Sequence, residues 1–184
     1  MATRCSMQMT IRRATLGDIP LLEPLIVESA RGLRSGYTEA QVEAALGYAL
    51  GVDQQLIRDG TYFVAEADSH VVGCGGWSKR KTLFGSDHVA GKDDARLDPA
   101  VDPARIRAFF VHPSWARRGI GSALLAACET AAQAEGFSRL ELVSTLPGEP
   151  LYRARGFVEM ERFAVSLPKG ESLPVIRMAK SIRG

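Results

Sequence analysis

The spacing of apolar residues changes along the chain, and each change predicts the type of the next element. Residues 10–14 have the pattern of a short strand, after which Thr15 and Asp18 have the spacing of a helix-capping box. An amphipathic helix follows, although Pro20 and Pro24 should distort its first turns. The apolar face of this helix recurs every three or four residues, at Ile19, Leu22, Ile26, Ala30 and Leu33.

Further helical and strand patterns complete the N-terminal half. Residues 38–50 predict a second helix, and residues 53–58 add about one more turn. Two strand patterns, 61–67 and 70–78, are separated by a two-residue turn, which is typical of a hairpin.

The C-terminal half alternates strands and helices. Helices are predicted at residues 120–135 and 150–155, each followed by a glycine. Strands are predicted at residues 105–112, 139–145, 157–167 and 173–182. This order indicates an α/β (α+β) fold, in which helices flank both faces of a central, mixed β-sheet.

The length of the chain and one irregular segment define its organisation. A chain of 184 residues with 46% hydrophobic side chains is long enough for one domain with a full core and too short for two ordinary ones. Residues 1–9 are expected to be a flexible N-terminus. Residues 79–103 are rich in Gly, Asp and Pro and predict a long loop, which in a compact domain is usually an active-site cover or a disordered insertion.

Charge and cysteine usage narrow the class of protein. A formal net charge of +2 gives no field that would demand nucleic acid as a partner, so any anion site must be local. The apolar runs are too short for a membrane helix, and residues 1–13 lack the apolar core of a signal peptide, so we expect a cytoplasmic protein without a membrane partner. Cys5, Cys74 and Cys128 are widely spaced, which favours structural thiols over disulfides or a metal site.

The strand at 105–112 leads into a glycine-containing turn and then a long helix, a pattern that predicts a phosphate site. The first N–H groups of a helix have no intrahelical partner, and the helix dipole adds partial positive charge there. The residues at this end are Arg117, Arg118, Gly119, Ile120, Gly121 and Ser122. Neither GxxxxGK[ST] nor GxGxxG is present in this segment, so the rival phosphate motifs do not fit. A tight turn with solvated arginines is the alternative.

Two segments, RIRAFFVHPSWARRGIGSALL and RLELVSTLPGEPLYRARGFVEM, resemble the GCN5-related N-acetyltransferase (GNAT) superfamily. The specific part of the resemblance is residues 105–160. It implies a splayed central sheet, acetyl-CoA as co-substrate without a metal, and a pyrophosphate held by residues 117–122. The resemblance also implies that the strand segment Phe109, Phe110 and Val111 contacts the pantetheine arm, and that Tyr152 protonates the departing thiolate.

The sequence departs from the family pattern at three positions. Ala116 stands where the family commonly has Arg or Gln, and Pro147 stands where it often has Asn, so two possible cofactor contacts are missing. Arg105 stands where some members place a catalytic Glu, which leaves the general base unassigned.

Direct acetyl transfer needs a neutral amine. An alkyl amine of pKa near 10.4 is neutral at pH 7 only about once in several thousand molecules, a deficit of about 4–5 kcal/mol. Desolvation, a base acting through water, or an acceptor of lower pKa must meet this deficit. The N–H of Val111 is the implied donor to the oxyanion, and Tyr152 is either the general acid or an aromatic that packs the short helix onto the sheet.

Several other residues have a structural and a functional interpretation. The candidates for the base are more typical of surface residues: Glu28, Glu39, His88 and His112. Trp77 would wall the acceptor pocket or pack in the core, and the neighbouring glycines Gly73, Gly75 and Gly76 mark close backbone approach. The run 79–81 is a solvated strand end, or a site for an acidic substrate or tRNA.

Three functions are therefore compared. The first is an N-acetyltransferase that moves an acetyl group from acetyl-CoA to the primary amine of a small molecule or a protein N-terminus by direct attack, with Tyr152 as general acid. The second is a non-catalytic acyl-CoA-binding sensor module. The third is an acetyltransferase toxin that acts on aminoacyl-tRNA. A homodimer through the C-terminal strands is compatible with each of them.

Overall fold

One open, mixed β-sheet organises the molecule, as the order of elements predicts. The computed structural model describes residues 8–88 and 91–182. Within these residues, seven strands form the sheet in the order β1-β2-β3-β4-β5-β7-β6. β4 and β5 are parallel, and the other neighbours are antiparallel. The strands are β1 (Met9–Arg13), β2 (Tyr62–Ala67), β3 (His70–Ser78), β4 (Ala104–Val111), β5 (Arg139–Thr145), β6 (Val158–Ser166) and β7 (Ser172–Ser181).

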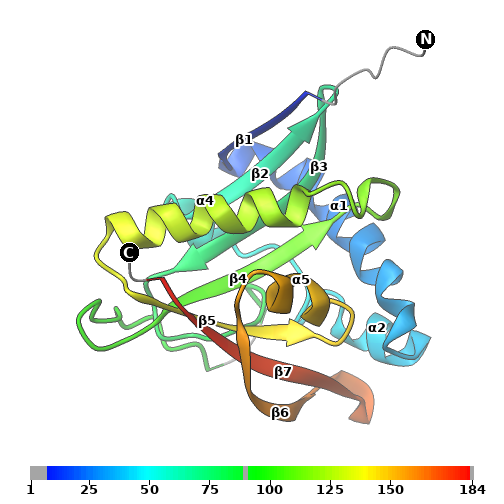
Figure 1. The fold of residues 1–184 in the computed structure, drawn as a ribbon. Coiled ribbons are helices and arrows are strands. Elements are labelled where there is room, and N and C mark those ends of the chain that lie inside the picture. The colour runs from blue at the N-terminus through cyan, green and yellow to red at the C-terminus, as the bar shows by residue number, and fades with distance from the viewer. Residues whose placement is uncertain (1–7, 89–90, 183–184) are drawn as a thin grey trace.

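Helices cover both faces of this sheet (Figure 1). On one face α4 packs Leu124 against Ala65 and Val72. On the other face the N-terminal helices pack Leu22 and Leu56 against alternate residues of β2. None of the described helices is long and apolar enough to cross a membrane. The helices are α1 (Ile19–Arg31), α2 (Glu39–Ala45), α3 (Gln54–Arg58), α4 (Ile120–Ala134) and α5 (Glu149–Ala154).

The N-terminal region differs from the sequence prediction in two places. The strand β1 begins at Met9, which pairs with Ala67, so the expected flexible segment is wrong at its last residue; residues 1–7 lie outside the described part of the chain. The predicted helix over residues 38–50 is wrong beyond Ala45, because Gly47 adopts a left-handed conformation (φ 73°) that no α-helix continues through.

The glycines of β3 are positions of close approach, as predicted. A Cβ atom added at Gly73 would lie 2.7 Å from Ile120 Cγ2, and one at Gly75 would lie 2.7 Å from the ring of Phe109. One at Gly76 would lie 2.6 Å from the Tyr62 ring. The missing side chains let α4 and two aromatic rings lie directly on the sheet.

The sheet opens between β4 and β5, which confirms its splayed form. The parallel ladder comprises Ala104↔Leu140, Arg105↔Glu141 and Ile106↔Leu142. Beyond Ile106 the strand β4 is bulged, because Ala108 has φ 55° and the register with β3 shifts between Cys74 and Gly76. The two strands then diverge, and the backbone edges that face the gap have no ladder partner there.

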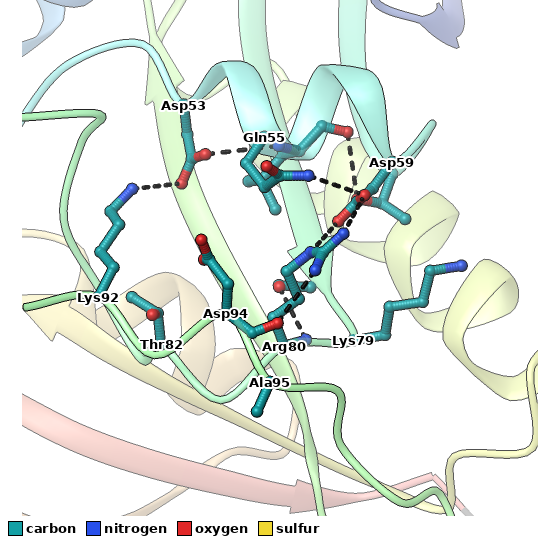
Figure 2. A network of polar contacts seen from close by, with 12 residues as sticks. Asp53, Gln55, Asp59, Lys79, Arg80, Thr82, Lys92, Asp94 and Ala95 are labelled. Atoms are coloured by element: carbon teal, nitrogen blue, oxygen red, sulfur yellow. Dashed lines mark hydrogen bonds and ion pairs between the residues drawn. The ribbon is translucent and has the colours of Figure 1, made fainter.

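The long loop at residues 79–103 is fixed to the ends of α3 (Figure 2). At one end of the helix, Arg80 forms an ion pair with Asp59, with Nε and Oδ2 2.6 Å apart. At the other end, Lys92 Nζ lies 3.6 Å from Asp53 Oδ2. Thr82 Oγ1 donates a hydrogen bond to the carbonyl of Asp93 and closes the loop on itself. The loop therefore has a defined course, although its described part contains no helix or strand.

Candidate active site

A cavity of about 810 Å³ runs through the gap in the sheet. One end is lined by residues at the beginning of α4, including Arg117 and Gly119. The middle lies between β4 and β5, beside Phe109 and Ser144, and the other end reaches Phe84 in the long loop. Two ligands could therefore enter from opposite faces and meet between the strands.

The turn before α4 presents a row of free backbone donors. Among the described residues, none accepts a hydrogen bond from the N–H groups of residues 117–122. Arg117 (φ 63°) and Gly119 (φ 83°) both adopt left-handed conformations, which curve this backbone into a concave turn. A side chain at Gly119 would project into open space, so a bulky anion can approach the backbone there. With the dipole of the 15-residue helix behind them, these donors can hold a phosphate group.

Guanidinium groups surround the same turn. Arg117 lines the cavity, and the guanidinium of Arg118 lies 4.8 Å from the centre of the Trp115 ring. Arg155, which the sequence interpretation missed, donates from Nε to Ser122 Oγ at 3.1 Å. The only signal for Arg155 was its position in the LYRARGF segment that also carries Tyr152. Arg155 therefore adds a third positive charge beside the turn, next to those of Arg117 and Arg118.

Three predicted cofactor residues can contribute through the backbone only. Ile120 is 1% exposed and packs in the core between α4 and β3, and Phe110 is 6% exposed and packs towards α1. Gly121 is also buried, and a Cβ there would lie 2.9 Å from Leu151 Cδ2. Their side-chain positions are occupied by protein packing, whereas their main chain borders the cavity.

The edge of β4 that faces the gap carries the N–H group of Val111. The N–H of Val111, the expected oxyanion donor, donates to Ser29 Oγ at 3.2 Å. Ser29 belongs to α1 and also lines the cavity. The sequence gives no sign of this contact, because the two residues are far apart along the chain. Phe109, two residues earlier, lies over Gly75 at the wall of the cavity.

Tyr152 lies on α5 where the cavity passes between the strands. Its ring packs edge-on against Phe109 and Phe157, with centroids 6.3 and 5.7 Å away. Among the described residues, none forms a hydrogen bond with its hydroxyl. Burial, with a smaller contribution from the Cys128 thiol, raises the pKa of Tyr152 well above its ordinary value. The hydroxyl is therefore protonated at neutral pH.

The acceptor end of the cavity is mainly apolar, apart from one buried ion pair. Arg107 on β4 lines the cavity and is 6% exposed. Its Nη2 lies 2.5 Å from Asp53 Oδ2 and donates to the carbonyl of Gly85 at 2.8 Å. The apolar side chains here are Leu33, Leu50, Leu83, Phe84, Val165, Leu173 and Val175.

None of the candidate bases reaches the cavity. Glu28, Glu39 and His88 are exposed, and His112 Nδ1 accepts a hydrogen bond from the N–H of Ser114. These positions agree with the surface interpretation of the four residues. Arg105, at the position where the family resemblance implied a possible acid, forms an ion pair with Glu141, which Arg177 also contacts.

Two further residues have structural roles. Trp77 is 1% exposed, packs edge-on against Phe137 and does not line the cavity, so its interpretation as a pocket wall is wrong and that as a core residue is confirmed. In the basic run, Lys79 forms an ion pair with Glu135, as Arg80 does with Asp59. This run is therefore largely engaged within the protein.

The arrangement fits coenzyme A. Unpartnered N–H groups and guanidinium groups suit its diphosphate, and the diverging strand edges suit the amides of its pantetheine arm. Tyr152 lines the same cavity.

Comparisons with known proteins agree with this fit. Residues 28–157 match the model of the Acetyltransferase (GNAT) family. No curated protein matches the chain significantly. Similar solved structures include a GCN5-related N-acetyltransferase from Rhodopseudomonas palustris, with TM-score 0.70 and 23% identity over 97% of this chain and 99% of that chain.

Two other structures are similar in the same way. The PaiA N-acetyltransferase from Thermoplasma acidophilum, solved in complex with coenzyme A, has TM-score 0.64 and 16% identity over 95% of this chain and 99% of that chain. The ribosomal-protein-alanine N-acetyltransferase from Brucella melitensis has TM-score 0.63 and 19% identity over 94% and 99%. At these identities the likeness shows the shared fold. The family match covers well over half of the chain, from α1 through β5 to α5, so the chain belongs to the acetyltransferase (GNAT) family.

Proposed function

We propose that the protein transfers an acetyl group from acetyl-CoA to the primary amine of a small molecule or a protein N-terminus by direct attack. One observation carries the proposal: a single cavity extends from the turn that carries Arg117, Gly119 and Ser122 to Tyr152, past the gap between β4 and β5. A ligand with a diphosphate at one end and a reactive group at the other matches this path.

In this proposal the chain holds acetyl-CoA at two places. Residues 117–122 bind the diphosphate through their backbone, with Arg117, Arg118 and Arg155 adding positive charge. The main chain of β4 from Phe109 to Val111 binds the pantetheine amides in the manner of an added strand. When bound, acetyl-CoA supplies the activated acetyl group.

Two groups of the chain then act on the reacting atoms. The N–H of Val111 donates to the carbonyl oxygen of the thioester once Ser29 releases it. Tyr152 lines the cavity, and its hydroxyl donates a proton to the sulfur of the departing thiolate. The apolar surroundings of Tyr152 exclude water, which strengthens this interaction.

The Tyr152→Phe variant tests the proposal. It keeps the aromatic packing and removes only the hydroxyl, so we expect kcat for CoA release to fall by about 100-fold, while the Kd of acetyl-CoA and the Tm stay unchanged. Tyr48→Phe is the matched control, because Tyr48 does not line the cavity. Equal kcat values for wild type and Tyr152→Phe would refute the role of the hydroxyl.

A sensor module is the second candidate, and one observation favours it. In the described part of the chain, no carboxylate or imidazole lines the cavity, and Arg105 replaces a possible acid. A sensor would bind acetyl-CoA tightly, would release no CoA with any amine, and would be indifferent to Tyr152→Phe. CoA release measured over amines of widely different basicity separates the two functions.

A further inference from the structure

Among the described residues, the cavity has no carboxylate to pair with an ammonium ion and no imidazole or carboxylate to deprotonate it. In the described part of the chain, the titratable side chains that line it are Arg107, Arg117 and Tyr152, and none of them is a base at neutral pH. Tyr152 keeps its proton, and the two arginines are cations. An acceptor that arrives as a cation therefore meets no counter-ion and no proton acceptor.

The wall at the acceptor end would also desolvate such an ion. Leu33 on the α1 side faces the cavity together with Phe84 of the long loop and Leu173 of β7. Moving a charged amine from water into apolar surroundings without a partner is strongly unfavourable, whereas an aromatic ring gains from the same surroundings. The acceptor end therefore favours an uncharged, apolar molecule.

Arg107 adds an electrostatic reason. Its partner Asp53 is fully buried and is not among the residues that line the cavity, whereas Arg107 is. Arg107 Nε has no hydrogen-bond partner among the described residues. Lys92, 3.6 Å from the same carboxylate, adds a second positive charge behind it. Asp53 is already paired with Arg107 and Lys92, so among the described residues it offers no free carboxylate to a cationic acceptor.

We propose that the acceptor is an apolar arylamine, taken up in its neutral form. The inference rests on the proposed acetyl transfer and names its acceptor class. The lone pair of an arylamine is delocalised into the ring, so the nitrogen is neutral at pH 7 and needs no general base. The nitrogen forms a bond to the acetyl carbon as the bond from that carbon to sulfur breaks. The nitrogen loses one proton to water, the sulfur gains one from Tyr152, and Tyr152 regains one from water, so the protein is unchanged and the products are the amide and free CoA.

Two isomeric amines of nearly equal apolar area test the acceptor class. 4-Ethylaniline is neutral at pH 7, whereas 2-phenylethylamine is an alkyl amine that is almost wholly protonated. We expect kcat/KM at pH 7 to be at least tenfold higher for 4-ethylaniline. Its kcat/KM should stay flat between pH 7 and 9, while that of 2-phenylethylamine should rise about tenfold per pH unit. A higher kcat/KM at pH 7 for 2-phenylethylamine, or for a polyamine, would overturn the inference.

A pair of variants places a charge in the apolar wall. Leu33 is half-buried, so Leu33→Asp and Leu33→Asn are compatible with folding and differ only in charge. We expect Leu33→Asp to lower the preference for 4-ethylaniline at least fivefold relative to Leu33→Asn. Equal preferences in the two variants would contradict the assignment of the acceptor to this end of the cavity.

Binding separates this inference from the proposed function. Calorimetric titration of both isomers into the protein saturated with CoA measures acceptor recognition without turnover. If neither amine is acetylated but 4-ethylaniline binds at least tenfold more tightly, acetyl transfer fails and the acceptor preference stands. If both are acetylated and 2-phenylethylamine is preferred, the acceptor class fails and acetyl transfer stands.

Discussion

Ser29 Oγ accepts the hydrogen bond of the Val111 N–H at 3.2 Å, and so occupies the donor that a thioester carbonyl would use. Ser29→Ala removes this competition. Since a hydrogen bond of this kind contributes about 0.5–1.5 kcal/mol, we expect acetyl-CoA to bind about two- to tenfold more tightly by calorimetry. Ser29→Thr keeps a hydroxyl and should bind as the wild type does. A lower kcat in Ser29→Ala would instead make the hydroxyl a participant in the reaction.

The turn before α4 allows a matched test of the phosphate site. Ser122 is half-buried, and Ser122→Glu would bring a carboxylate to the donors while Ser122→Gln brings the same bulk without charge. We expect Ser122→Glu to weaken acetyl-CoA binding at least tenfold more than Ser122→Gln does, with similar Tm values for both. Equal affinities would place the diphosphate elsewhere. Gly121→Glu is a poorer test, because its side chain would meet Leu151.

The anchoring of the long loop predicts a selective effect on the acceptor. Arg80→Met removes the ion pair with Asp59 and frees the loop that carries Phe84 to the cavity. We expect KM for the amine to rise severalfold while the Kd of acetyl-CoA is unchanged, because the phosphate turn lies at the other end of the cavity. Lys79→Met is the control, since Lys79 contacts Glu135 of the other helical layer. If KM for the amine and the Kd of acetyl-CoA both rose in Arg80→Met, the substitution would have disturbed the whole fold and not the loop alone.

Acid stability should depend on Asp18. Arg12 holds this carboxylate with two hydrogen bonds of 2.8 and 2.9 Å and lowers its pKa from 3.8 to about 2. A lowered folded-state pKa stabilises the protein above pH 4, and this contribution is lost as the pH falls towards 2. We expect Asp18→Asn to lower the free energy of unfolding at pH 7 by about 1–2 kcal/mol, with a difference from wild type that shrinks below pH 4. Denaturant unfolding at pH 7 and pH 3 measures both values, and Glu66→Gln, at the more exposed end of the network, should have the smaller effect.

The fold was largely predictable because its elements carry strong local signals. The strand at residues 139–145 was predicted with its observed bounds, and the helix at 120–135 to within one residue, because apolar spacing defines both and Gly136 marks the end of the helix. The helix at residues 38–50 was predicted too long. Its apolar residues continue beyond Ala45, but Gly47 ends the helix and those residues pack from a turn instead.

The site was only partly predictable. The cofactor residues lie in local sequence motifs, whereas the acceptor residues come together only in the folded chain. Residues 117–122 and Tyr152 lie in short motifs with recognisable spacing. Ser29 contacts Val111, and Asp53 contacts Arg107, across long separations in the chain. No local sequence motif therefore predicts these contacts. The acceptor wall is likewise assembled from α1, the loop and the C-terminal strands.

The short ladder from Ala104 to Ile106 also governs how the molecule responds to its ligand. It is the main backbone seam between two blocks of the sheet, β1–β4 and β5–β7, each internally paired over longer ladders. Acetyl-CoA bound between β4 and β5 would contact both blocks and would link them where the backbone hydrogen bonds between these two strands end. Amide hydrogen exchange at this seam should therefore slow when acetyl-CoA is added, and the two blocks should melt together at a higher temperature.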